Sequence, residues 1–584
     1  METKWSVYYP KDFTEASLNS SFTLYGRLMR VCGIFQDRTA YEYMGSKMSY
    51  STLAKAVNRA AVMWKKLGVS SGDKVLLCMG ACPDVLISVY AIDCLGASAV
   101  LMIPNSSSEH FEQKAIDTGA KFCLMSFNQY ENYAKYISRT KIETVVLGKY
   151  SDYITGIARN AFKLYPLSGY DAVVPAYKNR KSTDVKAVTW REAMSASEAE
   201  AAAGSLEPDT DDQRVCVMLE GESDTEDNTC AYSGYTMNMA ANLAMFLEKG
   251  SESRLGRPAR VLCLNEICFA FGFTVGMNDV LLAGQTMVLF TWFDTERLVQ
   301  AITRYRPDTI VGYYGTVARL NEKGINKAIM RTVSMMICGG GLLTVSQKAE
   351  LLTRSGRSED ELRICTVTGC DETMAFAYTP EVTSSDRMIG IPLPGVFMKV
   401  TDSETGEDMP QGKPGEIAVC SPSYFLGRVV CEKILSGSIR HLPDGRDWFF
   451  TGMIGKMDEK GFFYLISMPG RVYKINSFPV YPAQVDRIVS MVDGVVDVAS
   501  VVIEDVSGPK LVAAVVPSED LLFDNDLLAD LKKRIIDECR MMLHEAMCPS
   551  EVEFLINLPV DSSGNKDFDM ILERIENGRI SAGN

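Results

Sequence analysis

Residues 74–103 read KVLLCMGACPDVLISVYAIDCLGASAVLMI, with a short apolar run on either side of a helical segment. The two runs, Lys74–Met79 and Ala97–Ile103, have the length and apolar character of buried strands. The segment between them, Pro83–Leu95, is long enough for a helix. A strand, a helix and a second strand in this order form a βαβ unit, which predicts a parallel sheet.

The same alternation extends in both directions from this unit. An amphipathic helix is expected at Tyr50–Leu67, followed by the turn SSGD at 70–73. Later in the chain, helical periods separate four short apolar runs, which predict further buried strands at Arg260–Leu264, Thr286–Phe290, Thr309–Gly312 and Ser334–Ile337. This pattern predicts doubly wound sheets with helices on both faces.

The sequence pattern changes in two other regions. Between about Leu147 and Asp212 the chain becomes irregular and then polar, and this segment is expected to be an exposed connection. Between Gly390 and Tyr464, Gly and Pro interrupt short alternating strands, which predicts a β-rich subdomain. After Pro469, a compact α+β unit is expected, with strands at Val495–Ile503 and Leu511–Pro517 and a helix at Leu527–Met542.

These segments together predict the fold class and the domains. A chain of 584 residues is too long for one hydrophobic core. We predict an α/β protein with a large N-terminal domain at 1–466, built of doubly wound sheets and a β-rich subdomain. A small α+β C-terminal domain is predicted at 467–584.

The charge balance limits the classes of partner. The chain has 60 Lys and Arg residues against 74 Asp and Glu residues, a formal net charge of −14. Because a nucleic-acid binder needs a basic face, no nucleic-acid partner is expected. No apolar run approaches the roughly 18 to 20 residues that span a bilayer, and no signal peptide is visible. We expect a cytoplasmic protein without a membrane span.

Cysteine and histidine usage predicts neither a metal site nor a disulfide framework. The 16 cysteines include no CxxC pair and no Cys/His cluster, which is typical of reduced thiols in the cytosol. Most of them are expected to be small core residues. The three histidines, His110, His441 and His544, have no neighbouring ligand set, so a His-based catalytic triad is not expected.

Short motifs occur in a definite order from about Phe22 to the C-terminus. They include LGVSSGDK at 67–74, GGGLL at 339–343, GIPLPG at 390–395, PGEI at 414–417, DEKGFFY at 458–464 and VYPAQVD at 480–486. In this order and spacing they resemble the adenylate-forming superfamily of acyl-CoA synthetases, peptide-synthetase adenylation domains and luciferases. Each motif alone is weak, but the combination is highly specific.

The resemblance implies an activity and its reactants. Superfamily members activate a carboxylic acid with ATP to an acyl-adenylate and pyrophosphate. They then usually pass the acyl group to a thiol of CoA or of an acyl or peptidyl carrier protein. ATP and Mg²⁺ are the implied cofactors, and a carboxylic acid or acyl group is the implied ligand. The segment CFAFG at 268–272 lies where the superfamily has its acyl pocket, and it suits an apolar guest.

The phosphate loop of the superfamily is altered in this chain. Its usual form, Ser-Gly-Thr-Thr-Gly-x-Pro-Lys, holds the triphosphate with backbone N–H groups and a lysine. The matching segment reads EGESDTEDN at 220–228, without the later glycine and the lysine. The carboxylates of this loop have two interpretations: they bind a divalent cation, or they form a solvated acidic loop. We favour the solvated loop. Five carboxylates would repel the triphosphate, and each repulsion costs on the order of 1 kcal/mol. They are Glu220, Glu222, Asp224, Glu226 and Asp227.

The resemblance assigns further positions of the nucleotide site. In TGCDE at 368–372 it places Glu372 on Mg²⁺, and a carboxylate pair is able to bind a hard cation through oxygen. Nucleotide contacts are implied for Gly339, Gly340, Gly341, Gly369, Asp371 and Thr451.

Three other positions have lost the expected chemistry. Met453 stands where a carboxylate accepts hydrogen bonds from the ribose hydroxyls, and Met468 stands where the hinge region has an arginine. The C-terminal lysine that stabilises charge on the acyl phosphate is replaced by Asn565. Lys566 is one residue away, and a single-residue bulge would make it the catalytic lysine.

Three interpretations therefore remain open. One is an active acid-thiol ligase that uses Glu372 with Mg²⁺ and Lys566. Another is a pseudoenzyme that binds an acyl group, a carrier protein or an enzyme partner without activating ATP, and so needs no cofactor. The third is a ligase that uses a preformed acyl-adenylate. Because losses fall at four nucleotide contacts, we favour an acyl-CoA synthetase homologue whose adenylation is lost or much reduced.

Overall fold

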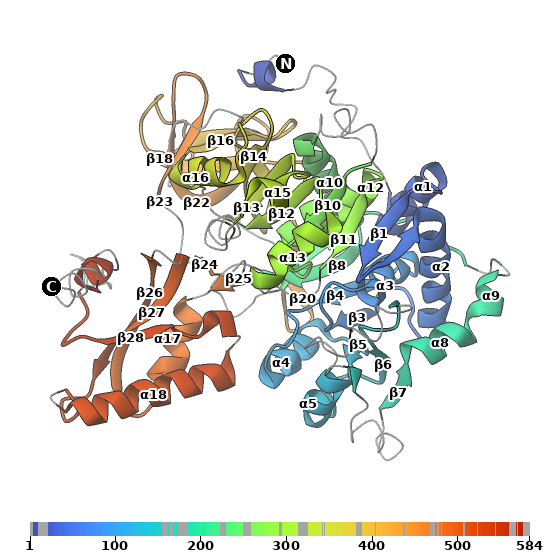
Figure 1. Ribbon diagram of the computed structural model, residues 1–584, viewed down its shortest axis with the longest axis horizontal. Coiled ribbons are helices and arrows are strands. Elements are labelled where there is room, and N and C mark those ends of the chain that lie inside the picture. Colours follow the sequence, from blue (N-terminus) through green and yellow to red (C-terminus); the bar gives the residue numbers. More distant parts are fainter. Residues whose placement is uncertain are drawn as a thin grey trace. The chain divides into compact units, whose positions relative to one another are not determined.

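The structure is a computed structural model of the chain (Figure 1). It describes residues 4–9, 22–154, 162, 169, 171–172, 185–202, 204, 206–221, 229–248, 258–290, 295–313, 320, 325–340, 343, 345–380, 388–402, 405–435, 439–467, 473–475, 478–480, 482–505, 508–522, 524–543, 545–559, 568 and 570–575. The chain divides into two compact units, one comprising Met1–Gly221 with Asp227–Pro469 and the other including Gly470–Asn584.

The first unit contains a nine-stranded sheet in the order β20-β19-β9-β8-β4-β3-β5-β6-β7. The strands from β8 to β7 run parallel, whereas β9 pairs antiparallel with β8 and with β19. The strands are β3 Lys74–Leu77, β4 Ser98–Leu101, β5 Phe122–Ser126, β6 Thr144–Gly148, β7 Lys186–Thr189, β8 Val215–Glu220, β9 Thr229–Ser233, β19 Gly427–Val430 and β20 Lys433–Leu435.

The βαβ unit predicted at 74–103 is confirmed. Strand β3 pairs parallel with β4, and the helix between them is α3, Pro83–Cys94. Every residue of α3 is buried, because this helix is apolar on nearly all sides and packs within the unit. The helix expected at Tyr50–Leu67 is α2, capped by Ser49, whose side chain accepts a hydrogen bond from the Thr52 N–H.

The second sheet of the first unit has fourteen strands. Its order is β17-β18-β22-β23-β16-β15-β14-β13-β12-β10-β11-β1-β2, and β21 pairs with β22. The four strands predicted between 260 and 337 are confirmed as the parallel set β10 to β13. The strands are β1 Thr39–Tyr43, β2 Ser46–Ser49, β10 Arg260–Cys263, β11 Thr286–Leu289, β12 Thr309–Tyr313, β13 Met335–Gly339, β14 Arg363–Cys370, β15 Met374–Tyr378, β16 Met388–Pro392, β17 Phe397–Thr401, β18 Gly415–Cys420, β21 Ile439–His441, β22 Asp447–Met457 and β23 Phe463–Ser467.

Helices cover these sheets and close their cores. One core joins α4 and α5 to the nine-stranded sheet through Phe111, Tyr130 and Val145. Another joins α13, α15 and α16 to β10, β12 and β13. The remaining helices of the unit are η1 Ser6–Tyr8, α1 Leu24–Ile34, α4 Ser108–Thr118, α5 Phe127–Ile137, α8 Trp190–Ala196, α9 Glu198–Ala202, α10 Gly234–Glu248, the π-helix η5 Gly272–Asn278, α12 Asp279–Leu282, α13 Thr295–Tyr305, α15 Lys327–Met330 and α16 Val345–Ser355.

The second unit is a small α+β fold with its own core of Val501, Val512, Ile571 and their neighbours. Its main sheet has the order β26-β27-β28, and β24 pairs with β25. The α+β composition predicted after Pro469 is confirmed. The elements are β24 Tyr473–Ile475, β25 Phe478–Val480, α17 Pro482–Ser490, β26 Val495–Asp505, β27 Gly508–Pro517, α18 Asn525–Met542, η6 Glu545–Met547 and β28 Glu551–Phe554.

The expectation of an irregular, exposed connection at 147–212 is wrong in part. The segment includes strand β7, which extends the parallel sheet, and the short helices α8 and α9. A capping box between Thr189 and Glu192 starts α8, and Trp190, the first residue of the helix, is buried. The polar composition of the stretch concealed these local signals.

The prediction that most cysteines are small core residues is confirmed. All sixteen cysteines lie in described residues, all are free, and most are buried. Cys431, at the turn from β19 to β20, is the exposed member of the set.

Gly390 in β16 gives a test of this architecture. Its φ is +104°, and a Cβ at this position would lie 1.9 Å from the Tyr378 carbonyl oxygen. Gly390→Ala is expected to lower the free energy of unfolding by more than about 2 kcal/mol, because left-handed strain adds to a backbone clash. Thermal unfolding followed by circular dichroism measures this change.

The matched control is Gly33→Ala in α1, where a Cβ meets nothing within 4 Å. This substitution is expected to leave stability unchanged or raise it by about 0.5 to 1 kcal/mol, because alanine favours helix. Equal melting temperatures for both variants would contradict the close packing of β16 on β15.

Candidate active site

The candidate site begins where β8 ends. Glu220 is the last residue of β8, and Thr229, opposite it in the register, is the first of β9. The backbone N–H of Glu220 donates to the Cys268 carbonyl oxygen at 2.8 Å. Residues 222–228, including Glu222, Asp224, Glu226 and Asp227, lie outside the described residues. The structure therefore defines only the two ends of the predicted acidic loop, at Glu220 and Thr229.

Glu220 does not belong to a solvated loop, so that part of the sequence prediction is wrong. Its side chain is fully buried and forms an ion pair with the Lys114 ammonium, which is only 2% exposed. Lys114 also donates to Thr229 Oγ1 at 2.7 Å. His110 Nε2 lies 3.1 Å from Glu220 Oε1, and the Ile103 N–H donates to the same oxygen at 3.2 Å. Both strands of the hairpin are thus fastened to α4.

The geometry of α4 explains this cluster. His110 and Lys114 are four residues apart, so they lie on the same face of the helix. The helix starts at the N-cap Ser107, whose hydroxyl accepts from the His110 N–H at 3.1 Å. Two potential cations on one helix face therefore meet one buried carboxylate.

Glu220 stays ionised in this surrounding. Burial would raise the pKa of its carboxyl, but the Lys114 ammonium and then His110 lower it, to about 2. The net effect is an anion held at the root of the loop at neutral pH.

A second ion pair borders the same hairpin. Arg428 in β19 donates to Glu372 Oε1 at 2.7 Å, and its Nη2 lies 3.9 Å from Asp371 Oδ2. The pairing of Arg428 with Cys230 in β9 positions the guanidinium beside the hairpin. Burial lowers the pKa of Arg428, but Cys230 and the two carboxylates raise it further than burial lowers it. The arginine is fully charged and already paired.

The predicted Mg²⁺ contact depends on this pair. One oxygen of Glu372 accepts from Arg428, and Asp371 is 5% exposed beside it. Mg²⁺ prefers several oxygen ligands in octahedral geometry. Within the described residues no group of three His, Cys, Asp or Glu side chains is placed to hold a metal ion. The described residues do not form a protein site for Mg²⁺ in this arrangement.

The glycines assigned to the nucleotide have structural roles of their own. A Cβ on Gly339 would lie 2.7 Å from the Phe271 ring, and Gly340 has a φ of +73°. Gly369 lies in the β14–β15 hairpin, where a Cβ would lie 2.6 Å from the Met374 carbonyl oxygen. Gly341 lies outside the described residues. Close packing explains Gly339 and Gly369 without a ligand.

Strand β22 contains the residues that the resemblance places at the ribose, Thr451 and Met453. The Thr451 hydroxyl donates to the Ile417 carbonyl oxygen at 2.8 Å, so it is used within the sheet. Met453 is buried, 4% exposed. The nearby carboxylate is Glu416, and its Oε1 accepts from the Gly452 N–H at 2.8 Å. Hydrogen bonding inside the sheet occupies the polar groups described here.

The C-terminal positions are not described. Lys566, Asn565 and Met468 lie outside the described residues. Lys566 therefore stays a prediction of the sequence.

The apolar segment CFAFG at 268–272 is largely buried. Cys268, Phe269 and Ala270 are buried, and the π-helix η5 begins at Gly272. Short π-helical turns are frequent at functional sites. Burial raises the pKa of the neighbouring Glu266 to about 7.

Sequence reasoning missed several residues of this region. Lys114 and His110 of α4 and Arg428 of β19 lie far from Glu220 in sequence, and only tertiary packing brings them to the hairpin. Asn265 was also missed; it is 5% exposed, and neither side-chain polar atom has a hydrogen-bond partner among the residues that the structure describes. Its place at the carboxyl end of β10 was the available signal, because ligands of α/β sheets bind at such ends.

Solved structures of other proteins share this fold. The amide bond synthetase McbA from Marinactinospora thermotolerans has a TM-score of 0.71 at 19% identity, over 94% of this chain and 99% of that one. The anthranilate CoA ligase AuaEII, solved with anthranoyl-AMP, has a TM-score of 0.62 at 17% identity, over 96% and 98%. The fold is that of the adenylate-forming enzymes, as predicted.

The family follows from the sequence match. Residues 29–212 and 233–427 match the AMP-binding enzyme family, and 484–565 match the AMP-binding enzyme C-terminal domain. The chain therefore belongs to the AMP-binding enzyme family, and the predicted resemblance is confirmed.

Two of its similar proteins are bacterial long-chain-fatty-acid-CoA ligases. The protein from Yersinia pestis is 24% identical over 97% of this chain and 96% of its own length. The protein from Bacillus subtilis (strain 168) is 23% identical over 83% of each chain. Within the part of the chain that the structure describes, no helix is long and apolar enough to cross a bilayer.

The buried ion pair predicts a specific stability pattern. Lys114→Met leaves a buried carboxylate without its main cation, and the expected loss is about 3 to 5 kcal/mol in the free energy of unfolding. The double variant Lys114→Met/Glu220→Leu removes both charges, and it is expected to regain most of that loss. Urea unfolding of the wild-type, single and double variants measures the coupling. Additive losses in the double variant would show that the two side chains do not interact.

The lowered pKa of Glu220 predicts a pH dependence. The carboxyl is more acidic in the folded state than its ordinary 4.5, so its stabilisation is present above that pH. It is lost as the pH falls toward 2. Between these values the melting temperature of the wild type is expected to fall more steeply than that of Glu220→Gln. Parallel curves would contradict the ion pair.

Proposed function

We propose that this chain is an acyl-CoA synthetase homologue in which carboxylate adenylation is lost or much reduced. In this proposal it binds an acyl group or a partner protein without activating ATP. The charge balance at the base of the former phosphate loop is the main support. Two cations, Lys114 and Arg428, stand against three carboxylates, Glu220, Asp371 and Glu372, and both cations are paired with them. A triphosphate would have to displace these pairs before it gained any attraction.

The extent of the family match supports the same proposal. The match is interrupted between 212 and 233, the segment that contains Glu220 and the loop 222–228. The match of the large domain ends at 427, before Met453, and that of the C-terminal domain ends at 565, before Lys566. The interruption therefore coincides with the segment that handles the triphosphate in the superfamily.

An active ATP-dependent acid-thiol ligase is the second candidate. Similarity over 97% of the chain to the Yersinia pestis ligase favours it, as does the match to the C-terminal domain. In that case Glu372 would release Arg428 to hold Mg²⁺ together with the phosphates, and Lys566 would stabilise the developing charge. CoA or a carrier protein would then accept the acyl group.

Both candidates keep an acyl ligand. In this proposal the chain of such a ligand lies along the apolar run of Cys268, Phe269 and Ala270, which is buried in this structure. A fatty acid is our proposed ligand class, because the long-chain ligases are similar over nearly the whole chain. A cytoplasmic location is also proposed, in keeping with the free cysteines.

Calorimetry with ATP and Mg²⁺, combined with pyrophosphate exchange over a panel of carboxylic acids that includes long-chain fatty acids, tests the proposal. We expect neither ATP binding at millimolar concentration nor acid-dependent exchange. Displacement of a fluorescent fatty-acid analogue, measured on the same preparation, is expected to report binding of the acyl ligand. Acid-dependent exchange in the wild type would overturn the proposal.

Two variants make the negative result specific. Glu372→Gln and Lys566→Ala are expected to leave every measured property unchanged. Exchange that disappears in either variant would instead assign that residue to a working ligase.

A further inference from the structure

The β-rich part of the first unit contains a cavity of about 320 Å³. Small-molecule sites occupy about 300 to 1,000 Å³, so this cavity is large enough for a ligand. Residues 398–400 of β17, the turn 408–413 and Met457 at the end of β22 line it, together with Lys4 and Trp5 from the N-terminal segment. We call this cavity the methionine pocket. None of its lining residues belongs to the candidate active site.

Hydrogen bonds and ring contacts fix the lining of the methionine pocket. The Gly412 N–H donates to the Met457 carbonyl oxygen at 3.1 Å, which fastens the turn to β22. The indole N–H of Trp5 donates to the Gly461 carbonyl oxygen at 2.8 Å. The centroid of the Trp5 ring lies 6.3 Å from that of the Phe463 ring. The pocket is therefore built from segments that are far apart in the sequence and held together in one unit.

Soft apolar side chains cover the interior of the pocket. Met398 and Val400 are buried, and Met409, Met457 and Trp5 are partly buried. Methionine side chains are flexible and polarisable, so they adapt to the shape of a ligand. The interior therefore suits a flexible apolar group.

The pocket offers few groups that would hold a polar ring. Gln411 is the one side-chain amide among the described lining residues, and its Nε2 already donates to the Asp458 carbonyl oxygen at 3.0 Å. No Ser, Thr, Tyr or Asn is among the described residues that line the pocket. A nucleobase or a sugar needs several fixed hydrogen-bonding partners. A hydrocarbon chain is therefore favoured over either of them.

Lysines border the pocket and outnumber its carboxylates. Asp408 is the one carboxylate among the described lining residues, and it forms an ion pair with Lys399 at 2.8 Å. Lys4 and Lys413 are exposed, and in the described part of the chain neither is paired with a carboxylate. Two ammonium groups therefore remain for the anionic end of a ligand.

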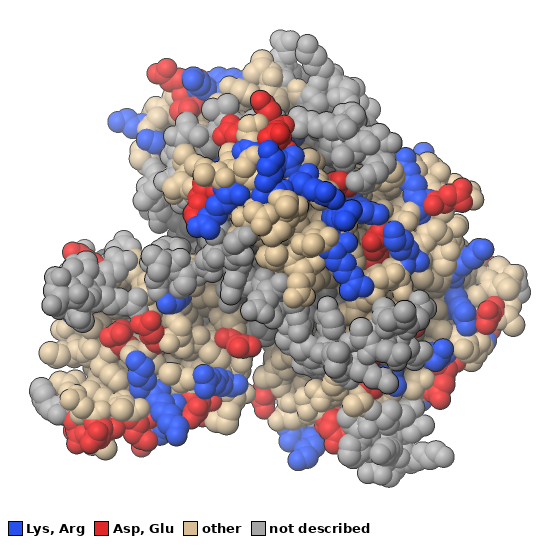
Figure 2. All heavy atoms as spheres, viewed as in Figure 1, with Lys and Arg blue, Asp and Glu red and all other residues tan. Residues whose placement is uncertain are grey.

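Surface charge alone does not mark a ligand site on this chain. Figure 2 shows Lys and Arg side chains interspersed with Asp and Glu side chains over the first unit. Glu407 and Glu459 are exposed beside lining segments in the sequence, although neither lines the pocket. The apolar interior is therefore expected to supply most of the affinity, and the two lysines are expected to select the sign of the charge.

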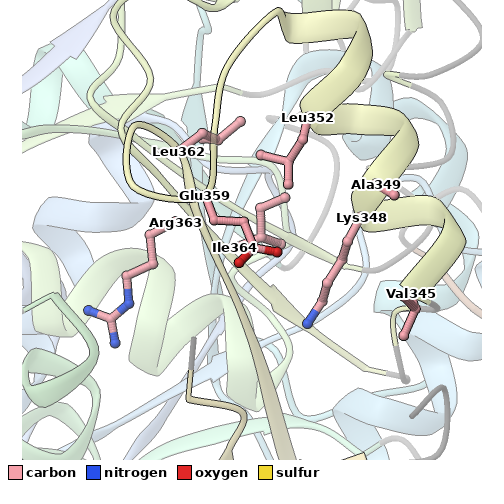
Figure 3. Close-up of a pocket in the computed structure, with 8 residues that line it drawn as sticks. All are labelled: Val345, Lys348, Ala349, Leu352, Glu359, Leu362, Arg363 and Ile364. Carbon is pink, nitrogen blue, oxygen red and sulfur yellow. The ribbon is translucent and has the colours of Figure 1, made fainter. Parts of the chain in front are cut away.

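The cavity between α16 and β14 lacks this arrangement (Figure 3). Its volume is about 130 Å³, below the range of small-molecule sites. In Figure 3 the Glu359 carboxylate lies between Lys348 and Arg363, the two cations of the lining. An anionic ligand would meet a carboxylate there, so it would gain less from the two cations.

We propose that the methionine pocket binds a medium-chain fatty acid. The hydrocarbon chain lies among the three methionines and Trp5, and the carboxylate lies at Lys4 and Lys413. The size and apolar interior of the pocket assign the chain, and the two lysines assign the charge. The occupied site joins the N-terminal segment to β17 and β22, because the ligand contacts all three. This site is separate from the acyl ligand of the proposed function and does not depend on adenylation.

Photoaffinity labelling of the full-length protein tests the proposal. The probe is decanoate with a diazirine at the end of its chain, and peptide mass spectrometry locates the label. We expect saturable labelling within residues 4–5, 398–400, 408–413 or 457, which unlabelled decanoate suppresses. Decan-1-ol is expected to compete about tenfold less well, because it lacks the charge that the lysines select. An absence of saturable labelling at these residues, or equal competition by decan-1-ol, would overturn the proposal.

Variants at exposed positions separate the site from general electrostatics. Lys4→Glu/Lys413→Glu is expected to weaken labelling about tenfold, and Trp5→Ala is expected to weaken it without a change of charge. The matched control Lys65→Glu/Lys135→Glu makes the same change of charge on α2 and α5, and it is expected to label like the wild type. Equal losses in both double variants would overturn the proposal, as would unchanged labelling in Trp5→Ala.

The position of the label separates this site from the acyl site of the proposed function. Label within 268–272 would report the acyl ligand of that proposal. Label only at 268–272 would overturn the fatty-acid site in the methionine pocket and leave the proposed function intact. Because ATP is absent, neither outcome depends on the exchange assay.

Discussion

The buried pair of Lys114 and Glu220 is the constraint on which the candidate site depends. An unpaired charge in the interior costs several kcal/mol, so the two side chains must stay together once the hairpin has formed. Lys114 reaches from α4 to both strands of the hairpin, because it contacts Glu220 and Thr229. The roots of the loop are therefore fixed by α4. Strand β19 pairs with β9 of the same hairpin, and its Arg428 forms an ion pair with Glu372.

Most of the fold could be predicted because its signals are local. The apolar run at Lys74–Met79 and the helix at Tyr50–Leu67 each have the length and periodicity of their element. The stretch around Trp190 was predicted wrongly, because a capping box and one buried aromatic residue outweigh a polar average composition. Strand order could not be read from periodicity, since β9 and β19 are about 200 residues apart in the chain and still adjacent in the sheet.

The candidate site could be predicted only in part. The motif TGCDE placed Glu372 near the nucleotide, but no local signal showed that Arg428 already holds its carboxylate. Glu220 looked like the first residue of a solvated acidic run, and its burial depends on α4, about 100 residues earlier. Pairing partners of buried charges come from tertiary structure. A site of this kind is recognised from sequence by its motifs, while its charge balance is known only from the fold.

The turn between β19 and β20 has a practical consequence. Cys431 is the exposed thiol among sixteen cysteines, and it follows the strand that contains Arg428. A maleimide dye would therefore attach preferentially at one place, close to the guanidinium that borders the hairpin, without any engineered cysteine. Fluorescence of a dye on Cys431 would report local rearrangement of β19. The unmodified sequence therefore already contains a labelling site for such measurements.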